Sequence, residues 1–302
     1  MNVQILLSTY NGERYLKPQI ESLLAQNYPD LKILARDDGS NDRTVHLLQE
    51  YAGHCPDIEI LPREHVGFVQ SFFELISRAS PRVDYFALCD QDDVWKADKI
   101  SRAVDVLNRH SAQIPLLYCS RVAIVDENLL PLGYSPIPRR PLTFRNALVE
   151  CQARGCTLVF NRAARQLLLD NFPKEAWSHD MWISLVAAAF GTIIYDPQPR
   201  ILYRKHFTNA VGITIRMKDT WRVKIAQFLK DRKLHLVVKQ AEEFRRIYGP
   251  VLPDEHRNVI ERFLNSRKKF WTRLRYAWAC DVYRQRIVDQ CILKARIALD
   301  LL

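Results

Sequence analysis

The sequence contains no long hydrophobic run. Its longest nearly uncharged segment, residues 181–195, is shorter than the roughly 20 apolar residues that a membrane-spanning helix needs. Met1 leads directly into the strand-like VQILLS, without the basic start or small-residue cleavage site of a secretory signal. We therefore expect neither a spanning helix nor a secretory leader, and a location in the cytoplasm.

Cysteines offer neither a disulfide framework nor a zinc signature. The chain has seven, an odd number at irregular spacings, and the closest pair, Cys151 and Cys156, does not have the spacing of a zinc site. We expect reduced thiols, with this pair packed in the interior. Internal repeats and low-complexity segments are also absent from the sequence.

Excess charge of one sign is missing from the first two thirds of the chain. Residues 1–215 hold 23 Lys+Arg and 24 Asp+Glu, whereas residues 216–302 hold 21 and 10, so the net charge of +10 comes entirely from the C-terminal part. Such asymmetry suggests a polyanionic neighbour, either nucleic acid or an anionic membrane surface. A solvated helical face explains it equally well. We predict a catalytic domain over 1–215 and a basic helical region over 216–302.

Short apolar runs alternate with helix-like stretches in residues 1–125. Strands separated by helices at this spacing predict an α/β fold, with a mostly parallel central sheet flanked by helices. The expected strands are 3–8, 31–37, 58–61 and 84–90, and the expected helices are 12–26, 42–51, 66–79 and 97–109.

The pattern becomes mixed over residues 115–212. We expect strands at 115–126, 154–160, 192–196 and 200–206, and helices at 162–171 and 178–191. Beyond residue 216 the chain is predicted to be helical, with an interruption at 248–256.

Three polar motifs follow predicted strands directly: STYNG (8–12), DDGSND (37–42) and DQDD (90–93). Ligands collect at the carboxyl ends of strands in such sheets. The acids Asp90, Asp92 and Asp93 would repel one another unless a cation neutralised them, and oxygen ligands favour Mg²⁺ or Mn²⁺. Alternatively, Asp92 or Asp93 caps the helix that follows.

The first two motifs suggest a nucleotide. A carboxylate at Asp38 could accept a hydrogen bond from a base or ribose, Tyr10 could stack on a nucleobase, and Ser8 and Thr9 could add polar contacts. The alternatives are a turn leading to an N-cap at Asp42 and an aromatic side chain that only packs.

Taken together, LLSTYNGERYLKPQIESLLAQNYPDLKILARDDGSNDRT and FALCDQDDVWKADKI resemble family 2 glycosyltransferases, which have the A-type (GT-A) nucleotide-sugar fold. The resemblance covers residues 1–212. CDQDDVW and LYRKHFTNAVG (202–212) are most similar to bacterial rhamnosyltransferases of surface polysaccharide or lipopolysaccharide core. The resemblance implies an inverting, Mg²⁺- or Mn²⁺-dependent transfer from dTDP-L-rhamnose, or from a UDP-hexose or UDP-hexosamine, to a glycan or lipid-linked acceptor.

The same resemblance implies roles for individual residues. Asp180, in SHDMW, matches the catalytic base, and its neighbour His179 stands where many members have Glu. Lys205 replaces the more usual Gln before His206. The nucleotide residues would be Ser8, Tyr10, Asp38 and Asp90, and the metal residues Asp92, Asp93 and His206, with Asp90 and Asp92 forming the D-x-D pair. Asp180 could instead be, or also be, the N-cap of its helix.

Five further residues complete the expected site. Arg204 and Lys205, at a strand end, favour a diphosphate contact. Gly155 would let the backbone approach an acceptor, although a bulge explains it equally well. Trp95 and Trp182 could shape the sugar pocket, or could simply pack in the core.

The C-terminal RKKFWTRLRYAW (267–278) suits an interfacial helix on anionic lipid, and the enzyme would then be peripheral on the inner face of the cytoplasmic membrane. Alternatively, its aromatic side packs inward. A nucleic-acid-binding protein or nuclease would use the basic tail and the acids but leave STYNG and DDGSND unexplained. The sequence has no Gly-rich phosphate loop, which argues against a nucleotidyltransferase. It also has no Gln-x-x-Arg-Trp motif, which argues against a processive synthase.

Overall fold

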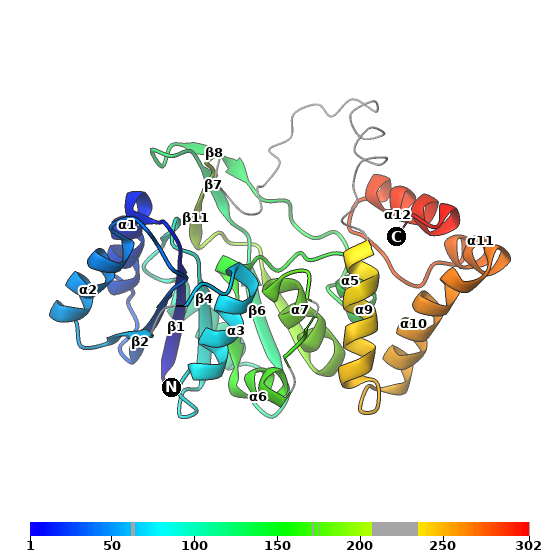
Figure 1. Ribbon diagram of the computed structural model, residues 1–302, viewed down its shortest axis with the longest axis horizontal. Helices are drawn as coiled ribbons and strands as arrows, with labels where there is room; N and C mark the ends of the chain where they lie inside the picture. Colours follow the sequence, from blue (N-terminus) through cyan, green and yellow to red (C-terminus); the bar gives the residue numbers. More distant parts are fainter. Residues whose placement is uncertain (62–63, 171, 175, 207–234, 302) are drawn as a thin grey trace. The chain divides into compact units, whose positions relative to one another are not determined.

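The described residues form two compact units (Figure 1). The computed structural model describes the chain except residues 62–63, 171, 175, 207–234 and 302. The first unit takes its residues from Met1–Ile137, Ala153–Asp170 and Gly191–Ile213, and the second from Pro138–Gln152, Asn171–Phe190 and Thr214–Leu302. The start of the predicted basic region, up to residue 234, and most of LYRKHFTNAVG lie outside the described residues.

A seven-stranded sheet organises the first unit, in the order β10-β6-β9-β4-β1-β2-β3. Every neighbouring pair is parallel except those of β9, which runs antiparallel to both β4 and β6. The predicted α/β class with a mostly parallel central sheet is therefore confirmed. The strands are β1 (Val3–Thr9), β2 (Leu31–Asp37), β3 (Ile58–Leu61), β4 (Tyr85–Cys89), β6 (Leu116–Ser120), β9 (Val159–Asn161) and β10 (Thr192–Asp196).

Helices cover both faces of this sheet (Figure 1). The chain moves from β1 to β2 to β3 in one direction and then returns to β4, so right-handed crossovers place α1 and α2 on one face and α3 on the other. Helix α3 contacts β1 and β2, and its buried side chains include Phe72, Leu75 and Ile76. The helices are α1 (Glu13–Leu24), α2 (Thr44–His54), α3 (Phe68–Arg78), α4 (Lys99–Leu107) and α6 (Arg162–Asp170).

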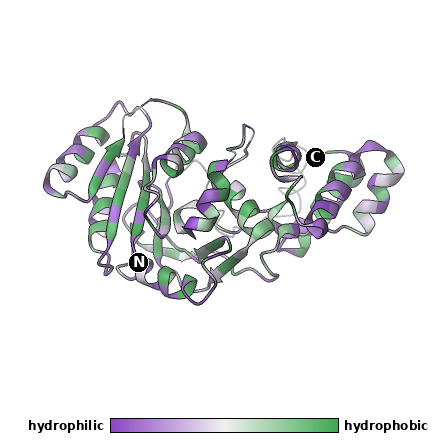
Figure 2. Cartoon of the chain, turned by 90° about the horizontal axis from the view of Figure 1, so that it is seen from below, coloured by the Kyte–Doolittle hydropathy of each residue, from purple (hydrophilic) through white to green (hydrophobic). Residues whose placement is uncertain are grey.

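The central strands form the core of the unit. All residues of β1 and β4 are buried, as expected for strands covered on both faces, and the strands carry hydrophobic stretches (Figure 2). Apart from Gln4 near the start of β1, polar residues appear only where these strands end, at the edge that carries the three motifs.

A smaller sheet accounts for two differences from the sequence prediction. The expected strand 115–126 is split into β6 and β7 (Ala123–Val125), and β7 belongs to a four-stranded sheet in the order β5-β11-β7-β8. The acidic motif is followed by β5 (Val94–Trp95), not by a helix, because β5 pairs with β11 (Ile201–Arg204). The strand β8 spans Pro131–Tyr134. Since α4 begins only at Lys99, the alternative in which Asp92 or Asp93 caps a helix is wrong.

The second unit is helical in its described part. An aromatic cluster of Trp182, Phe244 and Tyr248 joins two of its helices, and the predicted interruption after Tyr248 is present. In the described chain, we find no helix with the length and hydrophobicity to cross a bilayer. Its helices are α5 (Phe144–Ala147), α7 (His179–Phe190), α9 (His235–Tyr248), α10 (Asp254–Asn265), α11 (Phe270–Trp278) and α12 (Ile287–Leu299).

Candidate functional site

The register of the sheet brings the three polar motifs together. The strand β1 lies between β2 and β4, with Thr9 opposite Asp37 and Leu7 opposite Cys89. The loops that follow these strands therefore start at the same edge, as the sequence predicted. Gln91 joins two of them directly, because its side chain accepts from the Tyr10 amide at 2.7 Å and donates to the Tyr10 carbonyl at 2.8 Å.

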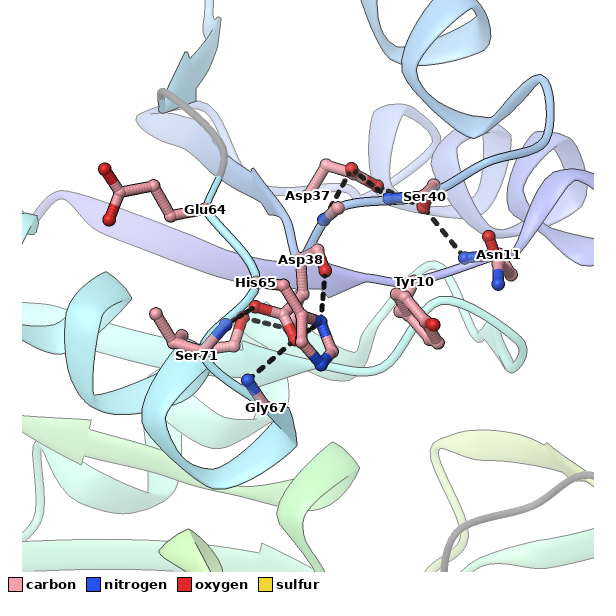
Figure 3. Close-up of polar contacts among 12 residues, drawn as sticks. Tyr10, Asn11, Asp37, Asp38, Ser40, Glu64, His65, Gly67 and Ser71 are labelled. Atoms are coloured by element: carbon pink, nitrogen blue, oxygen red, sulfur yellow. Dashed lines mark hydrogen bonds and ion pairs between the residues drawn. The ribbon is translucent and has the colours of Figure 1, made fainter.

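The buried carboxylate of Asp38 organises one side of this edge (Figure 3). It accepts hydrogen bonds from Arg36 at 2.8 Å and from the backbone amides of Val66 and Gly67 at 2.8 and 2.9 Å. His65 Nδ1 lies 3.2 Å from its second oxygen. The carboxylate thus fixes the loop before α3, and its acceptor sites face groups of the protein itself.

Arg36 extends the network to the first strand. Its guanidinium also donates to Ser71 Oγ at 3.0 Å, and Ser71 shares a 2.6 Å hydrogen bond with the predicted nucleotide residue Ser8. Both partners of the Arg36–Asp38 ion pair are only 4% exposed. A buried pair of this kind becomes strongly destabilising when one partner is removed, because the other charge is left uncompensated.

We therefore expect Asp38→Ala to lower the free energy of unfolding by about 3–5 kcal/mol, since it strands the Arg36 charge in the interior. Urea unfolding followed by circular dichroism measures this change. The matched control Asp30→Ala removes an exposed carboxylate and should stay within about 0.5 kcal/mol of the unchanged chain. A loss for Asp38→Ala no larger than that of the control would show that the network carries little stability.

Asp37 forms the turn that follows β2. Its carboxylate accepts from Thr9 Oγ1 at 3.0 Å and from the amides of Gly39 and Ser40 at 3.0 and 2.8 Å. Gly39 has φ of 86°, a conformation that disfavours any residue with a side chain. Thr9 is buried and held by this turn, so it positions the loop.

The ring of Tyr10 is the open part of this edge. It is 46% exposed, and the His65 ring lies beside it with centroids 5.4 Å apart (Figure 3). The side chain of His65 is itself 65% exposed. Two accessible rings, one directly after β1 and one in the loop before α3, form a surface on which a planar base can stack.

Asp92 is paired with His206 across the acidic loop. Oδ2 of Asp92 and Nε2 of His206 are 2.7 Å apart, and their side chains are 17% and 7% exposed. The His206 ring stacks on Tyr15, with centroids 4.9 Å apart. The structure thus brings together two of the residues predicted to hold a metal.

Arg204 is held against the acidic loop. It is buried, its backbone amide donates to Asp93 Oδ1 at 3.1 Å, and its Nε donates to the Asp92 carbonyl at 2.9 Å. Its Nη1 donates to the Glu127 carbonyl. Arg204 therefore braces the acidic loop from within, and its contact with a diphosphate stays a prediction. Lys205 is half-buried, and its amide donates to the Val125 carbonyl at 2.8 Å.

Two acids of this loop form a partly buried cluster with Cys156. Ligand atoms of Asp90, Asp93 and Cys156 lie within 4.8 Å of one another. Burial, then the charges of Asp92 and Asp90, raise the pKa of Asp93 well above its usual range. Burial also lowers the pKa of the neighbouring Lys99 to about 7. The acids therefore do repel as the sequence suggested, and Cys156 faces them instead of merely packing.

Two of the residues expected to touch substrate are buried. Gly155 begins a 3₁₀ helix, Gly155–Thr157, so residues 154–158 form neither the expected strand nor a bulge, and the strand β9 starts only at Val159. Trp95 is 3% exposed, with Lys99 Nζ 3.0 Å from the centroid of its ring. Both positions belong to the interior of the first unit.

The second unit carries the other predicted residues. Asp180 lies in the first turn of α7, where its carboxylate accepts from the Met181 amide at 2.8 Å and from Ser178 Oγ. Because α7 begins at His179, Asp180 lies inside the helix, and the alternative of an N-cap at Asp180 is wrong. His179 is buried, which lowers its pKa to about 4 and leaves it neutral at physiological pH. Trp182 is fully buried in the aromatic cluster of this unit.

Sequence reasoning missed several residues that build the site. Gln91, inside the DQDD motif, is the one that the sequence could have indicated. A polar residue between acids at a strand end is expected to lie at the site and not in the core. Three others carry no local signal, since their partners are far away in the chain: Tyr15, His65 and Ser71. Arg36 pairs with Asp38 only two residues further on, but its bond to Ser71 also joins distant segments.

Residues 4–167 match the family described as Glycosyl transferase family 2. This match spans more than half of the chain, and the chain therefore belongs to the family 2 glycosyltransferases. The family predicted from the motifs is confirmed.

Among the relatives, the chain is 29% identical to the dTDP-rhamnosyl transferase RfbG of Shigella flexneri over 234 residues, which are 72% of this chain and 77% of that protein. It is 25% identical to the putative teichuronic acid biosynthesis glycosyltransferase TuaG of Bacillus subtilis over 191 residues, 62% of this chain and 73% of that one. The crystal structure of S. aureus TarS 1–349 matches with a TM-score of 0.58 at 15% identity, covering 100% of this chain and 80% of that chain. The GT-A fold is thereby confirmed.

Proposed function

We propose that this chain transfers L-rhamnose from dTDP-L-rhamnose to a hydroxyl group of a glycan or lipid-linked acceptor of bacterial surface polysaccharide, with inversion at the anomeric carbon. The observation that carries the proposal is the sheet edge at which the exposed Tyr10 ring and the Asp92–His206 pair follow neighbouring strands. The similarity to a dTDP-rhamnosyl transferase over 72% of the chain supports the choice of donor.

The donor set at Asp92 and His206 fits a divalent cation such as Mg²⁺ or Mn²⁺. A carboxylate oxygen and an imidazole nitrogen 2.7 Å apart can both serve as ligands, and the carboxyl groups of Asp90 and Asp93 belong to the same loop. Asp93 Oδ2 is buried and has no hydrogen-bond partner among the described residues, which favours a nearby cation. A bound cation would stabilise charge that develops on the departing diphosphate.

The residues of the chain would bind the donor and accept the proton of the acceptor. Tyr10 stacks on the base of the donor, and the loop fixed by Asp38 holds the ring of His65 beside it. The acceptor oxygen bonds to the anomeric carbon while the bond from that carbon to the diphosphate oxygen breaks. The electron pair leaves with the nucleoside diphosphate, and the proton of the acceptor hydroxyl goes to the Asp180 carboxylate.

The location that we propose is the cytoplasm. None of the seven cysteines forms a disulfide in the described chain, and reduced thiols are typical of a reducing compartment.

Thermal unfolding with a panel of ligands tests the function. With Mn²⁺ present, dTDP-L-rhamnose at about 100 times its Kd should stabilise the full chain by about 2.7 kcal/mol, seen as a rise in Tm. UDP-glucose and UDP-N-acetylglucosamine should give smaller rises, and the larger rise with either one would reassign the donor. Stabilisation by RNA or DNA, with none from any nucleotide sugar, would overturn the proposal in favour of a nucleic-acid-binding protein.

A further inference from the structure

The outward face of α11, in the second unit, is apolar. Four side chains of this helix are exposed by 52%, 77%, 38% and 88%, respectively Phe270, Trp271, Leu274 and Trp278. Spacings of three and four residues put them on one side of the helix. Tyr276 and Ala277 face inward and are buried. An ordinary surface helix turns its polar side outward, whereas four large apolar side chains of α11 are exposed.

Unpaired cations border this face. In the described chain Arg273 and Arg262 form ion pairs with acids, whereas no ion pair is recorded for Lys268, Lys269 or Arg275, all of which are exposed. The sequence from 267 to 278 contains no Asp or Glu. An apolar face with exposed indole rings and uncompensated positive charge is typical of helices that lie in the headgroup region of anionic bilayers.

A pocket of about 450 Å³ opens beside the same helix. Tyr276 lines it and is only 8% exposed, and its hydroxyl has no hydrogen-bond partner among the described residues. Arg275 lines the pocket as well, next to the apolar face. Arg262 and Asp281, also in the lining, neutralise each other at 2.6 Å. A buried hydroxyl donor and an unpaired guanidinium are suitable partners for a phosphate oxygen.

We propose that α11 docks on an anionic lipid bilayer, with its aromatic side chains among the headgroups and a lipid phosphate in the pocket at Arg275 and Tyr276. The arrangement favours a bilayer over a second copy of the chain, because two such faces would bring like charges together. It stands independently of the transfer reaction, since it uses only residues of the second unit.

Co-sedimentation of the full chain with vesicles tests this docking. Vesicles that contain phosphatidylglycerol should bind it, binding should weaken as salt rises, and vesicles of phosphatidylcholine alone should bind at least about 10-fold less. The double variant Trp271→Ser/Trp278→Ser should weaken binding by about 10-fold or more, because both rings are exposed and their loss leaves the fold intact. Lys268→Gln/Lys269→Gln should weaken it by a similar factor.

Two further variants sharpen the result. Val251→Ser removes an exposed apolar side chain of the same unit that lies outside α11, 67% exposed, and should bind as the unchanged chain does. Tyr276→Phe removes only the pocket hydroxyl and should weaken binding by about 2- to 10-fold. Donor stabilisation measured in parallel should be equal in all variants, which separates a failure of docking from a failure of the proposed function.

Equal binding of the Trp double variant and the unchanged chain would overturn the proposal. It would also be overturned by a concentration-dependent dimer that the same variant abolishes, which would assign the face to a second copy. Loss of RNA binding in that variant, without vesicle binding by the unchanged chain, would assign the face to nucleic acid.

Discussion

Replacing Asp92 by asparagine is expected to lower kcat for sugar transfer by about 10³-fold, the typical cost of losing one group that stabilises charge on the transition state. Asparagine preserves the shape of the side chain and can still bond to His206 Nε2, which lies 2.7 Å from Asp92 Oδ2. The change therefore removes the negative charge and leaves the fold in place. Steady-state kinetics with dTDP-L-rhamnose and Mn²⁺ measures the rate.

Metal binding gives a second readout for the same variant. Affinity for Mn²⁺, titrated by electron paramagnetic resonance, should fall by at least about 10-fold, the loss seen when even an indirect partner of a metal is removed. Asp98→Asn is the matched control, because Asp98 lies six residues further along, is 43% exposed and forms an ion pair with Arg200 outside the acidic loop. If the Mn²⁺ affinity of Asp92→Asn is unchanged, the acidic loop does not bind the metal.

The sequence predicted the first half of the large sheet because its signals are local. Each of β1, β2, β3 and β4 is an apolar run bounded by polar residues, and burial on both faces requires little else. The position of the three motifs at one edge followed from parallel pairing alone, which the register of Thr9 with Asp37 and Leu7 with Cys89 bears out.

The parts that could not be predicted depend on distant partners. The two-residue strand β5 exists only because residues 201–202 pair with it, and no local pattern distinguishes it from the start of a helix. From the sequence, Arg204 is a cation at a strand end. In the structure its guanidinium donates to the Asp92 and Glu127 carbonyls. From the sequence, Asp38 is a carboxylate that could accept a hydrogen bond from a nucleotide. In the structure it accepts hydrogen bonds from Arg36 and from the loop before α3.

Asp180→Asn should abolish nearly all transfer while donor binding is kept. Removing a general base costs about 10²–10⁴-fold in kcat, because the amide cannot take the proton of the acceptor hydroxyl. The amide oxygen of asparagine can still accept the hydrogen bond from the Met181 amide, so α7 should begin as before. Turnover and the Kd of dTDP-L-rhamnose, measured on the same preparation, give the two quantities that must separate.

The control for this experiment is Asp254→Asn, which makes the same change in the first turn of another helix of the second unit. Its side chain is 89% exposed, so kcat should stay within about twofold of the unchanged chain if only the loss of a helix-terminal charge is at issue. A matching small effect in Asp180→Asn would leave Asp180 as a charge in the first turn of α7 and nothing more. Loss of donor affinity in place of turnover would instead assign its carboxylate to the cation, because a base that acts on the acceptor contributes nothing to holding the nucleotide.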